Sequence, residues 1–297
     1  MNVSNCQSGL EDRAPADRHR EHEYVLGHSE RELDRLSVQA KLFEPFTRQL
    51  FEEAGLGPGM RVLDVGCGSG DVAFLAADLV GSGGSVVGVD RARAAITRAS
   101  ARAQDLRFAN VRFVEGDPAA MEADGRFDAI VGRLVLMYYP EPADALRLLL
   151  KHARPGGLII FQEFDATACK SVPASPTYER CMAWINQTFQ RSGVRTQLGL
   201  ELYGLFLAVG LPPSGLRMDT PLATGPVHPA YEVVAEVVRS LLPTVEKLKI
   251  ATTEEVGIES LAHRLGKEVA ASHGVMVAPS LIGCWARKPD TGRLFVE

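Results

Sequence analysis

Hydrophobic positions along the first half of the chain follow two alternating spacings. Leu36, Ala40 and Phe43 recur at helix-like intervals, which predicts a helix over 29–54 that Pro45 breaks or restarts. Short apolar runs predict buried strands at 61–65, 86–89, 111–114, 127–131 and 158–164. Helical spacing between these runs predicts helices over 71–80, 94–105 and 142–153, the last stopped by the turn 154–157.

Strand and helix therefore alternate five times up to residue 164. Short strands that are apolar throughout, joined by helices, are typical of a parallel sheet covered by helices on both faces. The first half of the chain predicts a doubly wound α/β domain.

The second half breaks this alternation. Helices are predicted at 177–190, 200–209, 231–248 and 254–271, the third interrupted at Pro243. Strands are predicted at 216–219 and 275–286, the second bent near Pro279. These helices exceed what a bare sheet needs, so part of them is expected to cap the carboxyl ends of the strands, where ligands bind.

A glycine-rich turn follows the first predicted strand and leads into a helix. Its sequence is Gly66-Cys67-Gly68-Ser69-Gly70. Glycine lets the backbone approach a ligand closely, and the free N–H groups at a helix start favour anionic oxygens. Asp90 ends the next strand, where a carboxylate can bind both hydroxyls of a ribose. A dinucleotide fingerprint needs a third glycine where this chain has Asp71, so the spacing disfavours a nicotinamide cofactor.

With Asp64 and Val65 in front, this turn resembles the D-x-G-x-G-x-G motif of class I S-adenosylmethionine-dependent methyltransferases. Further matches follow in the family's order, with Asp90 at the ribose acid, Arg91 over the adenine and Gly116-Asp117 at the adenine amine. The resemblance covers residues 24–164 and, more loosely, the chain from residue 200 onward. It implies a Rossmann-like, doubly wound, mostly parallel sheet with a helical cap. It also implies S-adenosylmethionine as cofactor and S-adenosylhomocysteine as product.

Within that class the chain resembles the ubiquinone- and menaquinone-type methyltransferases and their relatives in small-molecule biosynthesis. Their helical lead-in folds over the methionine half of the cofactor, so Tyr24 and Gln39 are expected to reach its amino or carboxylate end. Pro118 departs from the family pattern because it has no backbone N–H to offer the adenine. Either Ala119 supplies one or the adenine is held otherwise. The cofactor-binding residues that the resemblance implies are Tyr24, Gln39, Asp64, Gly66, Cys67, Gly68, Asp90, Arg91, Asp117, Pro118 and Arg133.

These assignments predict four parts of the chain. They are a flexible tail over 1–22, a cofactor-binding core with its lead-in over 23–165, a cap over 166–272, and a final strand with its tail over 273–297. The cap segment is expected to return one helix and one strand to the core at about 200–220.

Methyl transfer from a sulfonium needs mainly alignment of the acceptor with the S–CH3 bond. A general base would add roughly 10²- to 10⁴-fold for a hydroxyl acceptor. The candidates are Glu163 at the end of the fifth strand, His28 in the lead-in and His228 beside a cap helix. The alternative for each histidine is that it is a surface or helix-capping residue. The alternative for Glu163 is that it anchors the lead-in.

The predicted cap helices are apolar on one face, which suggests a small, largely apolar acceptor, aromatic ones included. The alternative is that these faces pack on the sheet. The leading hypothesis is methyl transfer to an O, N or C atom in specialised metabolism. A quinone-pathway methyltransferase and a relative repurposed as a cyclase or regulator stay open.

Composition and charge limit the classes of partner that we expect the chain to bind. The net charge is -5 with basic residues scattered among acids, which disfavours nucleic acid. The five cysteines lack the spacing of metal ligands, so we expect free thiols in a reducing compartment and no metal site. No apolar leader or spanning segment is evident, so we expect a cytoplasmic protein with no membrane span. An exposed apolar cap helix could pair with a second copy, so a homodimer stays open.

Overall fold

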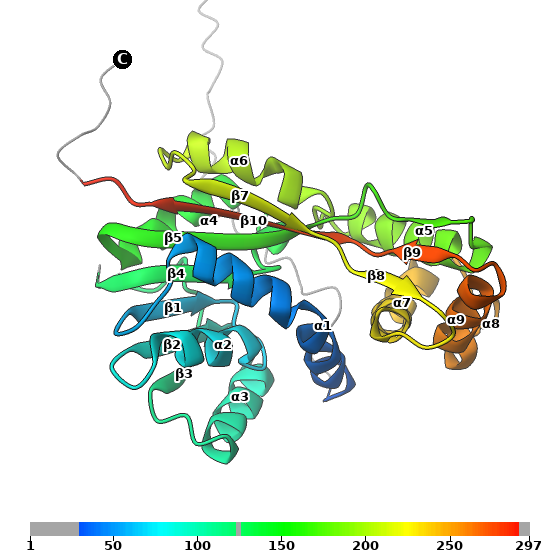
Figure 1. Ribbon diagram of the computed structural model, residues 1–297, viewed down its shortest axis with the longest axis horizontal. Helices are drawn as coiled ribbons and strands as arrows, with labels where there is room; N and C mark the ends of the chain where they lie inside the picture. The colour runs from blue at the N-terminus through cyan, green and yellow to red at the C-terminus, as the bar shows by residue number, and fades with distance from the viewer. Residues whose placement is uncertain (1–29, 123–125, 291–297) are drawn as a thin grey trace, which may run out of the picture.

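The computed structural model describes residues 30–122 and 126–290. Two lobes lie side by side (Figure 1). The large lobe is a seven-stranded sheet with helices on both faces, and the small lobe packs helices on a three-stranded sheet.

The large sheet has the strand order β3-β2-β1-β4-β5-β10-β7. Its strands are β1 (Arg61–Val65), β2 (Ser85–Asp90), β3 (Val111–Glu115), β4 (Phe127–Arg133), β5 (Ala153–Asp165), β7 (Gly215–Asp219) and β10 (Ser280–Arg287). The first five are parallel, and β10 is antiparallel to both of its neighbours. The order reverses between β1 and β4, which is where ligands bind in such sheets. The predicted doubly wound, mostly parallel sheet is confirmed.

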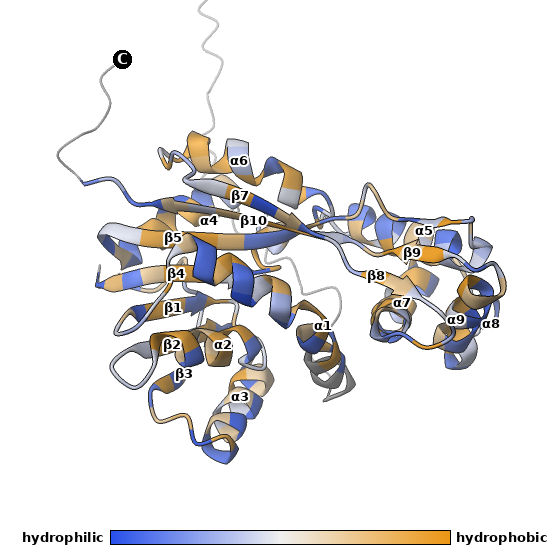
Figure 2. Cartoon of the chain, viewed as in Figure 1, coloured by the Kyte–Doolittle hydropathy of each residue, from blue (hydrophilic) through white to orange (hydrophobic). Residues whose placement is uncertain are grey.

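Helices cover both faces of the large sheet. Successive residues of a strand point to opposite faces, and in the central strands the residues on each face are apolar. In β1, Val62 packs in the cluster that includes α1 (Glu30–Ala54) and α2 (Asp71–Val80). Its neighbour Leu63 packs in the cluster that includes α4 (Pro142–Leu149) and α6 (Leu198–Ala208). A further helix, α3 (Arg93–Asp105), contacts β2 and β3. Figure 2 shows the hydrophobic strands at the centre of this sandwich.

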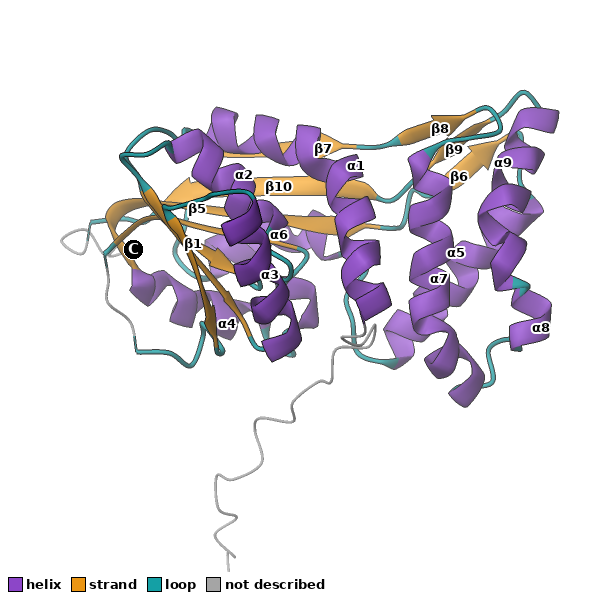
Figure 3. Ribbon diagram, turned by 90° about the horizontal axis from the view of Figure 1, so that it is seen from below, coloured by secondary structure: helices purple, strands orange, loops and turns teal. Residues whose placement is uncertain are grey.

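The small lobe continues three strands of the large sheet along their own direction. Its strands are β6 (Lys170–Val172), β8 (Leu222–Thr224) and β9 (Val275–Val277), and its order β6-β9-β8 repeats the order β5-β10-β7. Each short strand thus continues a long one, as Figure 3 shows from below. Its helices are α5 (Pro176–Arg191), α7 (Pro229–Lys247), α8 (Thr253–Val256) and α9 (Leu261–Ala271).

Two predicted helix breaks are wrong. Pro45 lies inside the continuous α1, and Pro243 lies inside the continuous α7. Each proline removes one backbone donor and costs about 3 kcal/mol in a helix interior. Packing compensates, since α1 contacts α2, α7, β5 and β10, and α7 contacts α5 and α9.

Three other boundaries also differ from prediction. The helix expected over 254–271 is divided into α8, the 3-10 turn η3 (Ile258–Ser260) and α9, because Gly257 adopts a left-handed φ of 54°. The strand expected over 275–286 is split at Pro279 into β9 and β10, which belong to different sheets. The turn expected at 154–157 lies within β5, where Gly156 and Gly157 pair with the backbone of Lys288.

The short strands β6 and β8 were not predicted. The division of the chain into four parts stays a prediction. Within the described ranges, no helix is both long and apolar enough to cross a membrane.

Candidate active site

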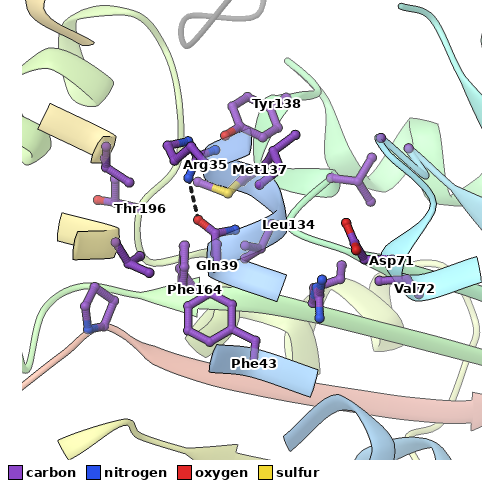
Figure 4. Close-up of a pocket in the computed structure, with 18 of the residues that line it drawn as sticks. Arg35, Gln39, Phe43, Asp71, Val72, Leu134, Met137, Tyr138, Phe164 and Thr196 are labelled. Carbon is purple, nitrogen blue, oxygen red and sulfur yellow. Dashed lines mark hydrogen bonds between the residues drawn. The ribbon is translucent and has the colours of Figure 1, made fainter. Parts of the chain in front are cut away.

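A cavity of about 560 Å³ lies at the carboxyl ends of β1, β2 and β4. Its walls come from both lobes, because α1 and the loops after these strands face α5 and α7 across it. Figure 4 shows side chains from α1, from the segment after β4 and from β5 converging on this space, among them Gln39, Tyr138 and Phe164.

The glycine-rich turn forms one end of the cavity. Gly66 and Gly68 adopt left-handed φ values of 65° and 51°. A Cβ on Gly66 would lie 2.5 Å from Cγ2 of Val135, so no larger residue fits there. A Cβ on Gly68 would meet only Leu36 at 3.8 Å and would project into the cavity. The turn is therefore shaped for close approach of a ligand to its backbone.

Asp90 is held beside this turn by two backbone donors. The N–H of Gly68 donates to Oδ2 at 2.9 Å, and the N–H of Ala92 donates to Oδ1 at 2.8 Å. Asp90 also lines the cavity. A carboxylate offers about four acceptor positions, so both oxygens keep capacity for hydroxyl donors of a ligand.

Asp64 lies beneath the turn rather than at the cavity wall. Burial raises the pKa of Asp64 well above its ordinary value, and the positive charge of Arg133 opposes this rise. Among residues 30–122 and 126–290, its Oδ2 has no hydrogen-bond partner. Arg133 reaches the wall and donates to Oγ1 of Thr47 at 3.0 Å. Thr47 in turn donates to Oε1 of Gln162 at 2.8 Å, so α1 is tied to β4 and β5 under the cavity. Cys67 lines the cavity, and burial raises the pKa of its thiol.

A second polar cluster closes the end of the cavity near β2. Asp117 accepts hydrogen bonds from Arg91 at 2.5 Å, from the hydroxyl of Tyr139 at 3.2 Å and from the N–H of Ala119 at 2.9 Å. Arg91 and Pro118 line the cavity, whereas Asp117 lies behind them. Since the N–H of Ala119 is directed to Asp117, it does not replace the donor that Pro118 lacks.

Arg35 and Gln39 of α1 form a buried pair at the cavity wall. Nη1 of Arg35 donates to Oε1 of Gln39 at 2.6 Å, and the two residues are 3% and 7% exposed (Figure 4). Gln39 was predicted from sequence and Arg35 was not. Their spacing of four residues on one helix face was the available signal.

The expected catalytic residues that the structure describes do not reach the cavity wall. Glu163 is fully buried, and its Oε1 accepts the N–H groups of Val135 at 3.0 Å and Leu136 at 2.8 Å. Through this oxygen it holds the segment after β4. His228 caps α7 by accepting the N–H of Ala230 at 3.1 Å.

Tyr24 and His28 lie outside the described residues. Within the described ranges, no three His, Cys, Asp or Glu side chains gather as metal ligands would.

Comparisons with known proteins agree with this arrangement. A family model described as a methyltransferase domain matches residues 56–197. The arsenite methyltransferase of Aquipseudomonas alcaligenes is 40% identical over 116 residues, which cover 36% of this chain and 34% of that protein. The nocamycin O-methyltransferase of Saccharothrix syringae is 38% identical over 122 residues, covering 40% of this chain and 43% of that protein. The chain thus spans less than half the length of either relative.

Among solved structures, the YcgJ protein of Bacillus subtilis superimposes with a TM-score of 0.57 at 19% identity, covering 82% of this chain and 99% of that one. This likeness concerns the fold.

Proposed function

We propose that this chain, whose residues 56–197 belong to the class I S-adenosylmethionine-dependent methyltransferase family, transfers the methyl group of that cofactor to a small, largely apolar acceptor. The observation that carries the proposal is one continuous cavity with two chemically different ends. Gly66, Gly68 and Asp90 line one end, and apolar side chains of α5 and α7 line the other.

The residues at the polar end fit the nucleoside part of S-adenosylmethionine. Asp90 accepts the ribose hydroxyls, because Gly68 and Ala92 hold its oxygens beside the turn. Gly68 leaves room where any other side chain would enter the cavity. Arg91 and Pro118 flank the adenine, and Asp117 keeps Arg91 in place through the 2.5 Å ion pair.

The methionine part of the cofactor would lie against α1 and the end of β4. Gln39 and Arg133 line that part of the wall, and we add Arg35, whose cation suits a carboxylate. Asp64 lies beneath the same turn, and within the described residues its Oδ2 has no hydrogen-bond partner, so this oxygen can accept a hydrogen bond from the cofactor's ammonium group.

The bound cofactor supplies a methyl group already activated on its sulfonium. The chain's own residues align the acceptor with the cofactor and keep water out of the cavity. Phe43, Met137 and Phe164 from the large lobe and the apolar faces of α5 and α7 hold an acceptor against the cofactor and exclude water. Positioning of this kind supplies most of what such a transfer needs.

The acceptor class follows from the cavity wall. The residues that α5 and α7 contribute are apolar with one exception, which suits an apolar molecule. The relative named for nocamycin O-methylation supports a small-molecule acceptor. We assign the acceptor to small, largely apolar molecules.

The proposal is tested with S-adenosylmethionine labelled in its methyl group and a panel of hydroxylated and aminated aromatic compounds. We expect label in one product class, with S-adenosylhomocysteine released in equal amount. Cofactor binding without any transfer across the panel would instead favour a non-catalytic use of the cofactor.

A further inference from the structure

The strand β7 forms one edge of the large sheet (Figure 1). Among the strands that the structure describes, only β10 pairs with it. The other edge of β7 therefore presents a row of backbone N–H and C=O groups on which a further strand can pair. Proline, lysine and bulges protect many sheet edges, and β7 contains none of them.

The face of β7 on the α6 side of the sheet is apolar and exposed. Leu216 and Met218 lie opposite Cys284 and Ile282 of β10, and Cys284 belongs to the core cluster that includes residues of α6. Leu216 and Met218 are each 54% exposed. The helix α6 packs on β10 and exposes three more apolar side chains at positions i, i+3 and i+7, which are Leu200, Tyr203 and Leu207. Exposed apolar side chains that gather on one face mark a surface for another molecule.

The opposite face of β7 carries two charges that compensate each other. Arg217 donates to both carboxylate oxygens of Asp219, at 2.7 and 2.8 Å. Because these residues are two positions apart, an antiparallel pairing of two copies centred on Met218 places each Arg217 opposite Asp219 of the second copy. A pairing centred on Arg217 or on Asp219 would instead place like charges opposite each other.

We infer that β7 is an interface through which two copies of this chain associate, in an antiparallel pair centred on Met218. The pair joins the two large sheets and covers the exposed apolar side chains of β7. A second copy is the occupant that fits, because in this register the strand complements itself both in charge and in its apolar face. The inference does not depend on the proposed function, since neither β7 nor α6 lines the cavity.

Sedimentation equilibrium of the full chain tests the association. We expect the wild type to be a dimer at about 100 μM and Met218→Lys to dissociate at least about tenfold more readily, because two lysines would face each other. Leu106→Lys is the control, since Leu106 is 55% exposed but lies at the end of α3. A monomeric wild type would overturn the inference and leave this edge to another occupant, and so would a dimer that Met218→Lys weakens no more than Leu106→Lys does.

Oxidative cross-linking of cysteine variants tests the register independently of the lysine variant. Opposite residues of an antiparallel pair have Cα atoms about 4.5–5.5 Å apart, which a disulfide can span, so Met218→Cys should link two copies. Leu216→Cys is equally exposed, but its two copies would lie about 14 Å apart along the strands and should not link. The wild type reports any linkage through the native cysteines. Equal linkage of the two variants, or linkage of neither, would contradict a pair centred on Met218.

Discussion

The backbone N–H of Gly68 donates a hydrogen bond of 2.9 Å to Oδ2 of Asp90. This bond joins the turn after β1 to the end of β2, so the backbone that approaches the cofactor and the carboxylate proposed for its ribose are fixed relative to each other. Both residues line the cavity.

Gly68→Ala is expected to weaken S-adenosylhomocysteine binding by about tenfold, because its Cβ enters the cavity and its φ of 51° strains an alanine by roughly 1–2 kcal/mol. Gly57→Ala is the control, since a Cβ there meets no atom within 4 Å. Calorimetry and thermal melting of both variants check this. Equal affinity of the two variants would mean that the turn does not contact the ligand.

Thr47→Val is expected to destabilise the fold by about 1–3 kcal/mol, because Arg133 and Gln162 lose a buried partner. It should also weaken cofactor binding, since Arg133 lines the cavity. Thr97→Val is the control, because that exposed hydroxyl donates to the carbonyl of Arg93 on its own helix. Denaturant titrations of both variants measure the difference, and a loss of the same size in Thr97→Val would refute the role of Thr47.

The large lobe could be predicted because its central strands are apolar on both faces, as Val62 and Leu63 of β1 show, and its helices have a clear spacing. The small sheet could not, because β6 and β8 have three residues each and carry no periodicity. The prolines at 45 and 243 misled for a related reason: packing between distant elements outweighs a local helix preference.

At the site, the motif residues Gly66, Gly68 and Asp90 were predictable, since their spacing carries the chemistry. Arg35 was missed because it belongs to no motif. Its place beside Gln39 matters only once α1 is known to face the cavity.

Glu163→Gln is expected to change the pH dependence of stability. Burial raises the pKa of Glu163 from 4.5 to about 8, although the N–H groups of Leu136 and Val135 oppose the rise. The folded state therefore keeps a proton that the unfolded state releases, and stability falls as the pH rises from about 4.5 to about 8. The glutamine cannot ionise and keeps an acceptor for both N–H groups.

The variant should thus exceed the wild type in unfolding free energy by on the order of 3 kcal/mol at about pH 9, with a smaller difference at about pH 6. Denaturant titrations at both pH values measure this. Parallel curves for the two proteins would contradict a raised pKa at this position.

Glu268→Ala is expected to destabilise the small lobe by about 1–3 kcal/mol. Its carboxylate accepts hydrogen bonds from Ser175 and from Thr177 at the start of α5, which tie that helix to α9. Glu254→Ala, at an exposed position on α8, is the control. Hydrogen exchange should rise at the start of α5 in the first variant only, and similar protection in both would show that Glu268 is dispensable.

The most direct test of the proposed cofactor site is calorimetric titration of S-adenosylhomocysteine, with NADH beside it, into the wild type, Asp90→Ala and the control Glu115→Ala. We predict that the wild type and the control bind S-adenosylhomocysteine and not NADH, and that Asp90→Ala binds about 100-fold more weakly while still melting cooperatively. Equal affinity in Asp90→Ala, or binding of NADH in place of S-adenosylhomocysteine, would contradict the assignment of this cavity.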